Sequence, residues 1–155
     1  MKGFTVFELL IAIAILAVVS GFTILNLFGY RRYQDVNLTG QEIAAVLRNA
    51  QNRSLAQESG APWGVHFENS TTGDDYYELF SGSSYTATSA IYSTTVLRPT
   101  VEFSTPVSGS NKNVRFAAAT GFVSASEVGE IRVSLKGSPS VSSTIYVNAN
   151  GRIDY

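Results

Sequence analysis

Cysteine is absent from the 155-residue chain, and histidine and methionine occur once each. The absence of cysteine excludes disulfides, thiolate metal sites and a cysteine nucleophile. It leaves the redox compartment undetermined, because disulfides are the feature that would have indicated one. A domain outside the cytoplasm would therefore have to hold its loops by packing alone.

Patterns typical of catalysis are also missing. The one histidine, His66, alternates with Val65 and Phe67, a setting in which histidine usually faces solvent or has its hydrogen bonds satisfied. No Gly-x-Ser-x-Gly elbow, glycine-rich phosphate loop or zinc-ligand spacing occurs. Asp74 and Asp75 fit no recognised calcium loop and favour a turn. The sequence therefore predicts no enzyme, no cofactor and no metal.

Charge is scarce and nearly balanced, with 11 basic residues, 12 acidic residues and a formal net charge of −1. Such a chain lacks the overall basic footprint that is typical of nucleic-acid binding. The composition is uneven along the chain. The first 28 residues are almost wholly apolar, whereas the rest is rich in Ser, Thr, Asn, Gly and Tyr. This predicts one small domain with an apolar N-terminal appendage.

The apolar appendage runs from Phe4 to Phe28. As an α-helix it would be about 37 Å long, enough for the roughly 30 Å hydrocarbon core of a membrane. A cleaved secretory signal is the alternative, but residues 17–21 make a poor cleavage site of the small-x-small kind. Lys2 precedes the run and Arg31 and Arg32 follow it, so a literal positive-inside count places the C-terminal side in the cytoplasm. Length thus predicts a membrane-spanning helix without fixing its orientation.

Glu8 stands near the start of this apolar run. An ionised carboxylate is costly in hydrocarbon, so its presence requires a partner or a use. On an ordinary membrane anchor it would lie near the membrane surface, where the helix N-terminus favours an anion. The residues around it favour a more specific interpretation.

The motif around Glu8 reads Gly3-Phe4-Thr5-Val6-Phe7-Glu8-Leu9-Leu10. It resembles the processing site of type IV pilins and pseudopilins. The resemblance implies a peptidase cut between Gly3 and Phe4, N-methylation of Phe4 as the mature terminus, and Glu8 as the fifth mature residue. In this family the glutamate pairs with the α-amino group of a neighbouring subunit. A paired charge in an apolar setting fixes register, because any slip leaves it unpaired.

The segment 29–57 is predicted to continue the helix with one apolar face. Its apolar residues recur at three- and four-residue steps and are Val36, Ile43, Val46, Leu47 and Ala50. Gly40 is expected to weaken this helix. Gly60 and Pro62 are expected to end it.

Residues 58–155 are predicted to form a β-rich head of short strands separated by turn residues. The expected strands are Trp63–Phe67, Tyr76–Ser81, Ile91–Leu97, Val101–Phe103, Val114–Phe116, Gly129–Leu135 and Ile145–Val147. Asn150-Gly151 predicts a hairpin near the C-terminus. The Ser- and Thr-rich stretch 81–95 fits either a loop or a polar strand face. The three Asn-x-Ser/Thr matches are about what this composition gives by chance, and only Asn69, in an expected loop, is a plausible glycosylation acceptor.

The order of these elements is similar to the minor-pilin and pseudopilin family called GspH/FimT. The similarity rests on Val114-Arg115-Phe116 with Gly121, on the run Gly129–Val133, and on Ile145–Val147 with Gly151-Arg152. It implies an α+β, type IV pilin-like fold, in which a long N-terminal helix packs on a small antiparallel β domain of two sheets.

Some proteins of that family bind DNA through basic residues near the C-terminus. The corresponding candidates for DNA contact here are Arg115, Arg132 and Arg152. However, Asp154 stands where the DNA-binding version tends to have a second arginine, and a carboxylate repels the phosphate backbone. A DNA-binding minor pilin for DNA uptake is therefore the alternative interpretation.

The leading interpretation is a structural pilin or pseudopilin subunit of a type IV pilus-like or type II secretion filament. Its expected parts are a leader (1–3), a transmembrane and filament-core helix (4–28), an amphipathic helix (29–57) and an extracytoplasmic head (58–155). The expected partners are other subunits, a prepilin peptidase and the cytoplasmic membrane. The expected location is the bacterial cytoplasmic membrane before assembly, then a pilus or pseudopilus in the periplasm or at the cell surface.

Overall fold

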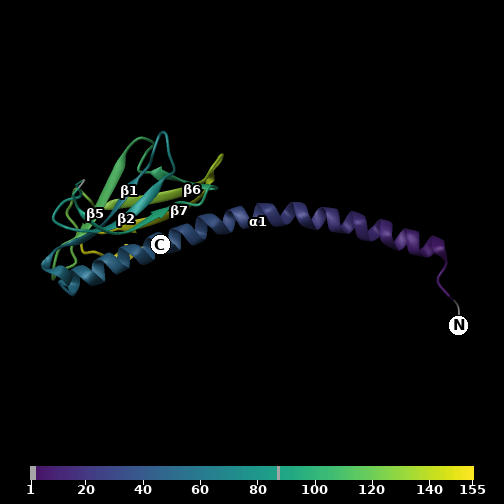
Figure 1. Ribbon diagram of the computed structural model, residues 1–155, viewed down its shortest axis with the longest axis horizontal. Coiled ribbons are helices and arrows are strands. Elements are labelled where there is room, and N and C mark those ends of the chain that lie inside the picture. The colour runs from purple at the N-terminus through teal and green to yellow at the C-terminus, as the bar shows by residue number, and fades with distance from the viewer. Residues whose placement is uncertain (1–2, 87) are drawn as a thin grey trace. The chain divides into compact units, whose positions relative to one another are not determined.

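The computed structural model describes residues 3–86 and 88–155, with the backbone alone for residues 21–29. Two compact units divide the chain, Met1–Gln34 and Asp35–Tyr155. The first two residues of the predicted leader lie outside the described residues. Helix α1 (Val6–Leu55) supplies the regular structure of the first unit and continues into the second (Figure 1).

Helix α1 joins the two predicted helical segments, 4–28 and 29–57, into one element. It ends at Leu55, two residues before the predicted boundary. Gln57 then adopts a left-handed conformation with φ of 53°, and a short 3₁₀ turn, η1 (Glu58–Gly60), follows. Ala61 returns to extended backbone. The helix therefore stops just before the glycine and proline that were expected to end it.

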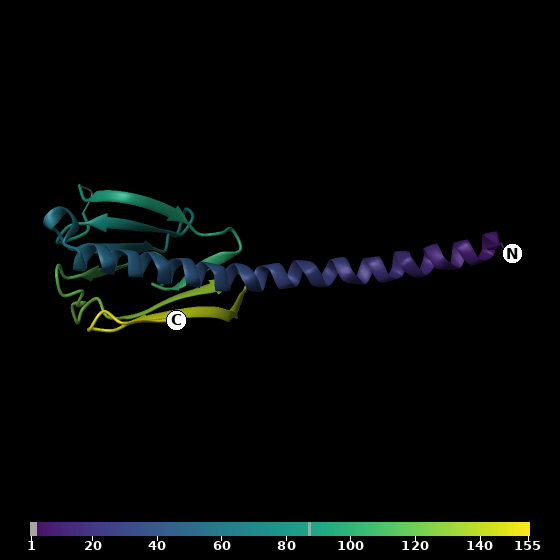
Figure 2. The same cartoon turned by 90° about the horizontal axis from the view of Figure 1, so that it is seen from below.

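The predicted apolar face of α1 is the face that it buries in the second unit. Four of the five residues of that face are at most 1% exposed, namely Val36, Ile43, Leu47 and Ala50. Val46 is partly buried against the same core. Because these positions are three or four residues apart, they lie on one side of the helix. This part of α1 runs across both sheets of the head (Figure 2).

The head contains two four-stranded antiparallel sheets. The first has the order β3-β2-β1-β5 and the second the order β4-β6-β7-β8. Their strands are β1 (Trp63–Glu68), β2 (Tyr76–Ser81), β3 (Ala90–Val96), β4 (Val101–Thr105), β5 (Asn111–Phe116), β6 (Gly129–Leu135), β7 (Ser138–Val147) and β8 (Ile153–Asp154). The architecture confirms the α+β fold with two small antiparallel sheets.

The register of each sheet brings apolar side chains together on one face. In the first sheet Val65 lies opposite Leu79 on β2 and opposite Val114 on β5. In the second sheet Ile131 lies opposite Ile145. All five side chains are at most 4% exposed. Because side chains alternate along a strand, one core between the sheets and α1 follows from this register.

One strand of the head is longer than the sequence predicted, and two other expectations are met. Strand β7 begins at Ser138, whereas the predicted strand began at Ile145. Its first residues are mostly Ser and Thr on a largely solvated face, so they lack the apolar run that marked the other strands. The end of the Ser- and Thr-rich stretch 81–95 belongs to strand β3. The predicted hairpin is confirmed, since Gly151 N donates to Asn148 O at 2.9 Å between β7 and β8.

Ser54 fastens the end of α1 to the first sheet. Its fully buried hydroxyl accepts a bond from Trp63 N at 2.8 Å and donates to Phe116 O at 2.9 Å. Its carbonyl oxygen accepts from Ala119 N at 3.0 Å. A buried polar group that lacks a hydrogen-bond partner costs about 1–3 kcal/mol. The Ser54 hydroxyl avoids this cost for two backbone groups, Trp63 N on β1 and Phe116 O on β5.

Arg98, in the β3–β4 connection, ties the head to α1 at another point. Its guanidinium donates to Glu42 at 2.6 and 3.0 Å and to Thr39 Oγ1 at 2.9 Å. Hydrogen bonding to Glu42 raises the pKa of Arg98, and this keeps the guanidinium charged. Nearby, Thr100 donates to Asp35 at 2.8 Å. These bonds hold the first turns of the helix in this unit against the β3–β4 connection.

Gly40, which was expected only to weaken the helix, is required by close packing. A Cβ at this position would overlap Ser143 Oγ and would lie 2.6 Å from the ring of Tyr155. Tyr155 also donates from its hydroxyl to Asn37 O at 2.8 Å. The glycine therefore lets α1 approach β7 and the C-terminal residue.

Asn69, the plausible glycosylation acceptor, is buried in the structure. Its side chain is 5% exposed, and its Nδ2 donates to Phe103 O at 2.8 Å and to Pro106 O at 2.7 Å. Asp75 is also buried and accepts bonds from Ser70 N and Phe103 N. Both polar side chains therefore form hydrogen bonds with backbone groups of the head.

Candidate assembly site at the N-terminus

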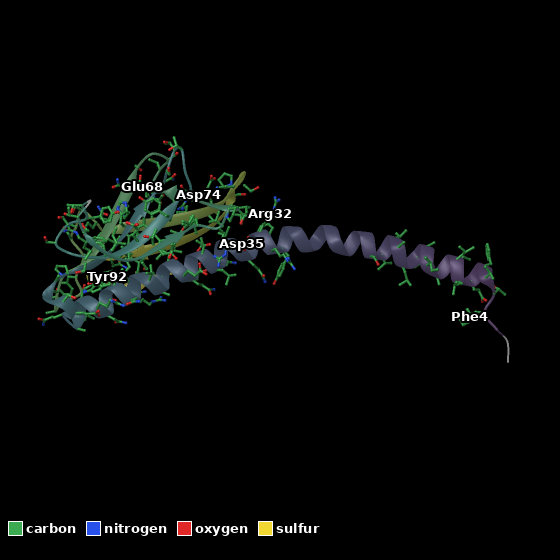
Figure 3. All side chains as sticks on the ribbon, in the orientation of Figure 1. Phe4, Arg32, Asp35, Glu68, Asp74 and Tyr92 are labelled. Carbon is green, nitrogen blue, oxygen red and sulfur yellow. The ribbon has the colours of Figure 1, made fainter. Side chains whose placement is uncertain are left out.

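The motif residues Gly3–Leu10 span the start of α1, with Gly3, Phe4 and Thr5 ahead of the helix. Phe4 lies just ahead of the helix and is 88% exposed (Figure 3). Large apolar side chains follow on every side of the helix, and those of Val6, Phe7, Leu9, Leu10 and Ile11 are 45% to 78% exposed. Within the described part of the chain, nothing covers this apolar surface.

Thr5 and Glu8 cap the start of α1 reciprocally. The carboxylate oxygen Oε2 of Glu8 accepts from Thr5 N and from Thr5 Oγ1, each at 3.0 Å. In return, Glu8 N donates to Thr5 Oγ1 at 3.3 Å. This arrangement is a capping box, in which two otherwise unpaired N–H groups of the first turn find partners.

Thr5 is a residue whose role the motif alone did not reveal. The signal was present, because Thr5-x-x-Glu8 has the spacing of a capping box before an apolar run. The carboxylate is thereby held on the first turn, beside the peptide bond of Phe4. A cut between Gly3 and Phe4 would create an amino group one residue ahead of this cap.

Among the described residues, no helix is both long enough and apolar enough to cross a membrane.

The three arginines considered for DNA contact are each paired with a carboxylate. Arg115 Nε lies 2.6 Å from Glu127 Oε1, and Arg152 Nε lies 2.6 Å from Asp154 Oδ1. Arg132 Nη2 lies 3.2 Å from Glu130 Oε2. The structure thus places these arginines beside acidic groups at separate positions of the head.

His66 is buried on the outer face of the first sheet. Its Nδ1 lies 2.7 Å from Asn113 Oδ1 and its Nε2 lies 3.3 Å from Glu68 Oε2. Its ring stacks on Tyr85 with 3.7 Å between centroids. The hydroxyl of Tyr85 donates to Glu78, and burial raises the pKa of Tyr85. These contacts give the histidine a packing role in the head.

Comparisons with known proteins concern a short N-terminal motif and the fold of most of the chain. The prokaryotic N-terminal methylation motif matches residues 1–24. No curated protein matches the chain. Among solved structures, the Pseudomonas aeruginosa type IV minor pilin FimU is similar, with a TM-score of 0.52 and 15% sequence identity. The match covers 77% of this chain and 90% of that one, and at this identity it shows the fold.

The methylation motif lies at the start of α1, and the fold match extends over most of the chain. The motif is a local pattern of residues, whereas the fold depends on how the helix and the two sheets pack. The chain therefore carries an N-terminal methylation motif and a head whose fold is similar to that of a type IV minor pilin.

Proposed function

We propose that the chain is a structural subunit of a type IV pilus-like or type II secretion filament, processed after Gly3 and assembled through α1. The observation that carries the proposal is the motif from Gly3 to Glu8 at the start of an exposed apolar helix. That helix continues into a head with a minor-pilin fold.

Processing and assembly would use the same short motif. A prepilin peptidase would cut after Gly3, and Phe4 would carry the new, N-methylated amino group. That group is cationic, and Glu8 of an adjacent subunit would supply the opposite charge. Inside an apolar bundle such a pair admits one register, because displacement by a helical turn leaves both charges unpaired.

Before assembly, residues 4–28 would lie in the cytoplasmic membrane and the head would be extracytoplasmic. The support for this step is the row of exposed apolar side chains on the first turns of α1, which requires an apolar environment. Lipid would provide that environment first, and neighbouring helices would replace it in the filament.

The experiment that tests processing is N-terminal sequencing and mass measurement of the chain extracted from membranes. The expected terminus is methylated Phe4. A Gly3→Val variant is expected to keep its leader, and its head is expected to unfold at the same temperature, because no atom lies within 4 Å of a Cβ at Gly3. An intact Met1 in the unsubstituted chain, or a cut within the apolar run, would contradict the proposal.

DNA binding is the competing function. Each of the three arginines already has a carboxylate within 3.2 Å, so a phosphate would have to displace that partner. We expect no salt-sensitive DNA binding by the full chain in detergent at low ionic strength. Arg152→Ala is expected to change nothing in the same gel-shift titration. Tight binding that weakens steeply with salt and is lost in Arg152→Ala would favour the DNA-uptake role instead.

A further inference from the structure

A pocket of about 510 Å³ opens in the head beside strand β4. Its lining comes from the β1–β2 connection, β4, the β4–β5 connection, β6, the β6–β7 turn and β7. Sites for small ligands typically measure about 300–1,000 Å³, and a few well-placed polar groups fix the orientation of the ligand. The polar groups of this pocket therefore indicate what it can hold.

Three of the polar side chains that line the pocket are more than nine-tenths buried. They belong to Asn69, Asp75 and Ser134, which are 5%, 8% and 1% exposed. The amide of Asn69 has a fixed orientation, because only its Nδ2 can donate to the carbonyl oxygens of Phe103 and Pro106. Within the described part of the chain, its Oδ1 accepts no hydrogen bond. This oxygen is therefore an acceptor that a molecule in the pocket can use.

Ser104 and Ser134 form a pair of hydroxyls in the lining of the pocket. Their Oγ atoms are 2.6 Å apart and share a hydrogen bond. Two hydroxyls carry two protons, and one proton is enough for the bond between them. The second proton is free to donate, because neither hydroxyl has another partner among the described residues. The pair therefore offers one donor to a molecule in the pocket.

Glu102 and Lys136 bring opposite charges to the same pocket. Glu102 lies directly opposite Ser134 in the pairing of β4 with β6. The two side chains are therefore neighbours on one face of the sheet. Lys136 follows in the turn after β6. Neither charged group has a hydrogen bond or an ion pair with another side chain in residues 3–86 and 88–155, so both charges are available to a ligand.

The pocket thus combines hydrogen-bond acceptors with donors. Its acceptors are Asn69 Oδ1 and the carboxylates of Asp75 and Glu102. Its donors are the ammonium group of Lys136 and the serine pair. Two carboxylates would repel a small anion, and Lys136 would repel a small cation. A hydroxyl-rich, uncharged ligand fits both kinds of group, because each hydroxyl donates one hydrogen bond and accepts others.

The lining also has an apolar part, which consists of Val107 and Pro139. The side chain of Val107 is 68% exposed, so it is open to contact with a ligand. A saccharide ring has hydroxyls around its edge and C–H groups on its faces. It therefore matches a polar pocket that has a small apolar wall.

We propose that this pocket binds a saccharide, as one uncharged monosaccharide unit of a glycan. Glu102 accepts hydrogen bonds from neighbouring hydroxyls of the sugar, and Lys136 and the serine pair donate to others. The pocket lies wholly within the unit Asp35–Tyr155, so binding does not depend on the assembly motif. Glu8→Gln is therefore expected to lose filaments and to retain saccharide binding.

Glycan-array binding of the full chain tests the proposal, in a detergent that has no sugar headgroup. The array carries glycans that end in glucose, galactose, mannose or N-acetylglucosamine. The unsubstituted chain is expected to bind at least one of them, and the free monosaccharide is expected to compete. Glu102→Ala is expected to weaken this binding roughly tenfold or more, because hydrogen bonds to a charged group are lost.

Asp74→Ala is the matched control for the loss of a negative charge. Asp74, labelled in Figure 3, is exposed and stands between two residues of the lining without lining the pocket itself. This variant is expected to bind the glycan as tightly as the unsubstituted chain. The proposal would be overturned by absence of binding to every glycan, by binding that Glu102→Ala leaves unchanged, or by an equal loss in both variants.

A bulky side chain in the pocket gives a second test that leaves its charges unchanged. Ser108 is exposed and lines the pocket, so Ser108→Trp is expected to fill part of the space for the sugar and to abolish binding. Ser83→Trp, in the exposed β2–β3 connection, is the control and is expected to bind normally. Both variants are expected to unfold at the temperature of the unsubstituted chain. Normal binding by Ser108→Trp would place the glycan elsewhere and contradict the proposal.

Discussion

Glu8→Gln is expected to remove most filament assembly while leaving the start of α1 capped. Glutamine can replace glutamate in a capping box, so the bonds with Thr5 are retained. It carries no charge to pair with the amino group of Phe4 in an adjacent subunit. Filament yield should fall by roughly an order of magnitude or more, because removing one member of a desolvated pair leaves the other unpaired. Immunoblots of sheared filaments and of membranes measure yield and insertion separately.

The matched variant Thr5→Val separates the cap from the charge. It removes the hydroxyl that donates to Glu8 and accepts from Glu8 N, and it keeps the carboxylate. We expect a much smaller loss of filaments than for Glu8→Gln, with equal amounts of both variants in the membrane. Normal filaments from Glu8→Gln would rule out the charge mechanism. An equal loss in the two variants would assign the defect to the helix cap.

Gly151→Ala is expected to destabilise the head more than other single-methyl additions. Gly151 has φ of +82°, and a Cβ there would overlap Gly121 O and the side-chain amide of Gln51. Its own carbonyl accepts from Gln51 Nε2 at 2.9 Å, which ties the hairpin to α1. Left-handed backbone costs an alanine about 1–2 kcal/mol and overpacking about 1–3 kcal/mol, so the free energy of unfolding should fall by roughly 2–5 kcal/mol. Denaturant titration of the full chain in detergent measures it.

Gly137→Ala provides the control for the backbone contribution. Gly137 has φ of +78°, close to that of Gly151, but no atom lies within 4 Å of its Cβ position. Its loss of stability should therefore be the backbone cost alone, about 1–2 kcal/mol. An equal loss of unfolding free energy in the two alanine variants would contradict the expected overpacking of Gly151 against Gly121.

Local patterns predicted the elements of this fold well. The three- and four-residue spacing that includes Ile43 and Leu47 identified the buried face of α1. The bounds of β2 and β6 follow their apolar and β-branched runs, and Asn150-Gly151 marked the hairpin. These features depend on neighbours within a few residues, so the sequence carries their full signal.

Properties that depend on distant residues were not predicted. Asn69 has the sequence of a glycosylation acceptor, but its amide bonds to Phe103 and Pro106, more than 30 positions away. The need for a glycine at position 40 comes from Ser143 and Tyr155. The cap by Thr5 in the candidate assembly site is different, because the Thr5-x-x-Glu8 spacing did carry a local signal for it. A partner set by tertiary packing leaves no local pattern to read.

The capping box also affects the entropy of assembly. A frayed helix end would have to lose its backbone freedom when it joins a neighbour, at a cost of about 1–2 kcal/mol per residue fixed. The bonds between Thr5 and Glu8 already order the first turn in the free chain. A subunit would thus present its carboxylate on a preorganised surface, and less of the binding free energy would be spent on ordering the chain.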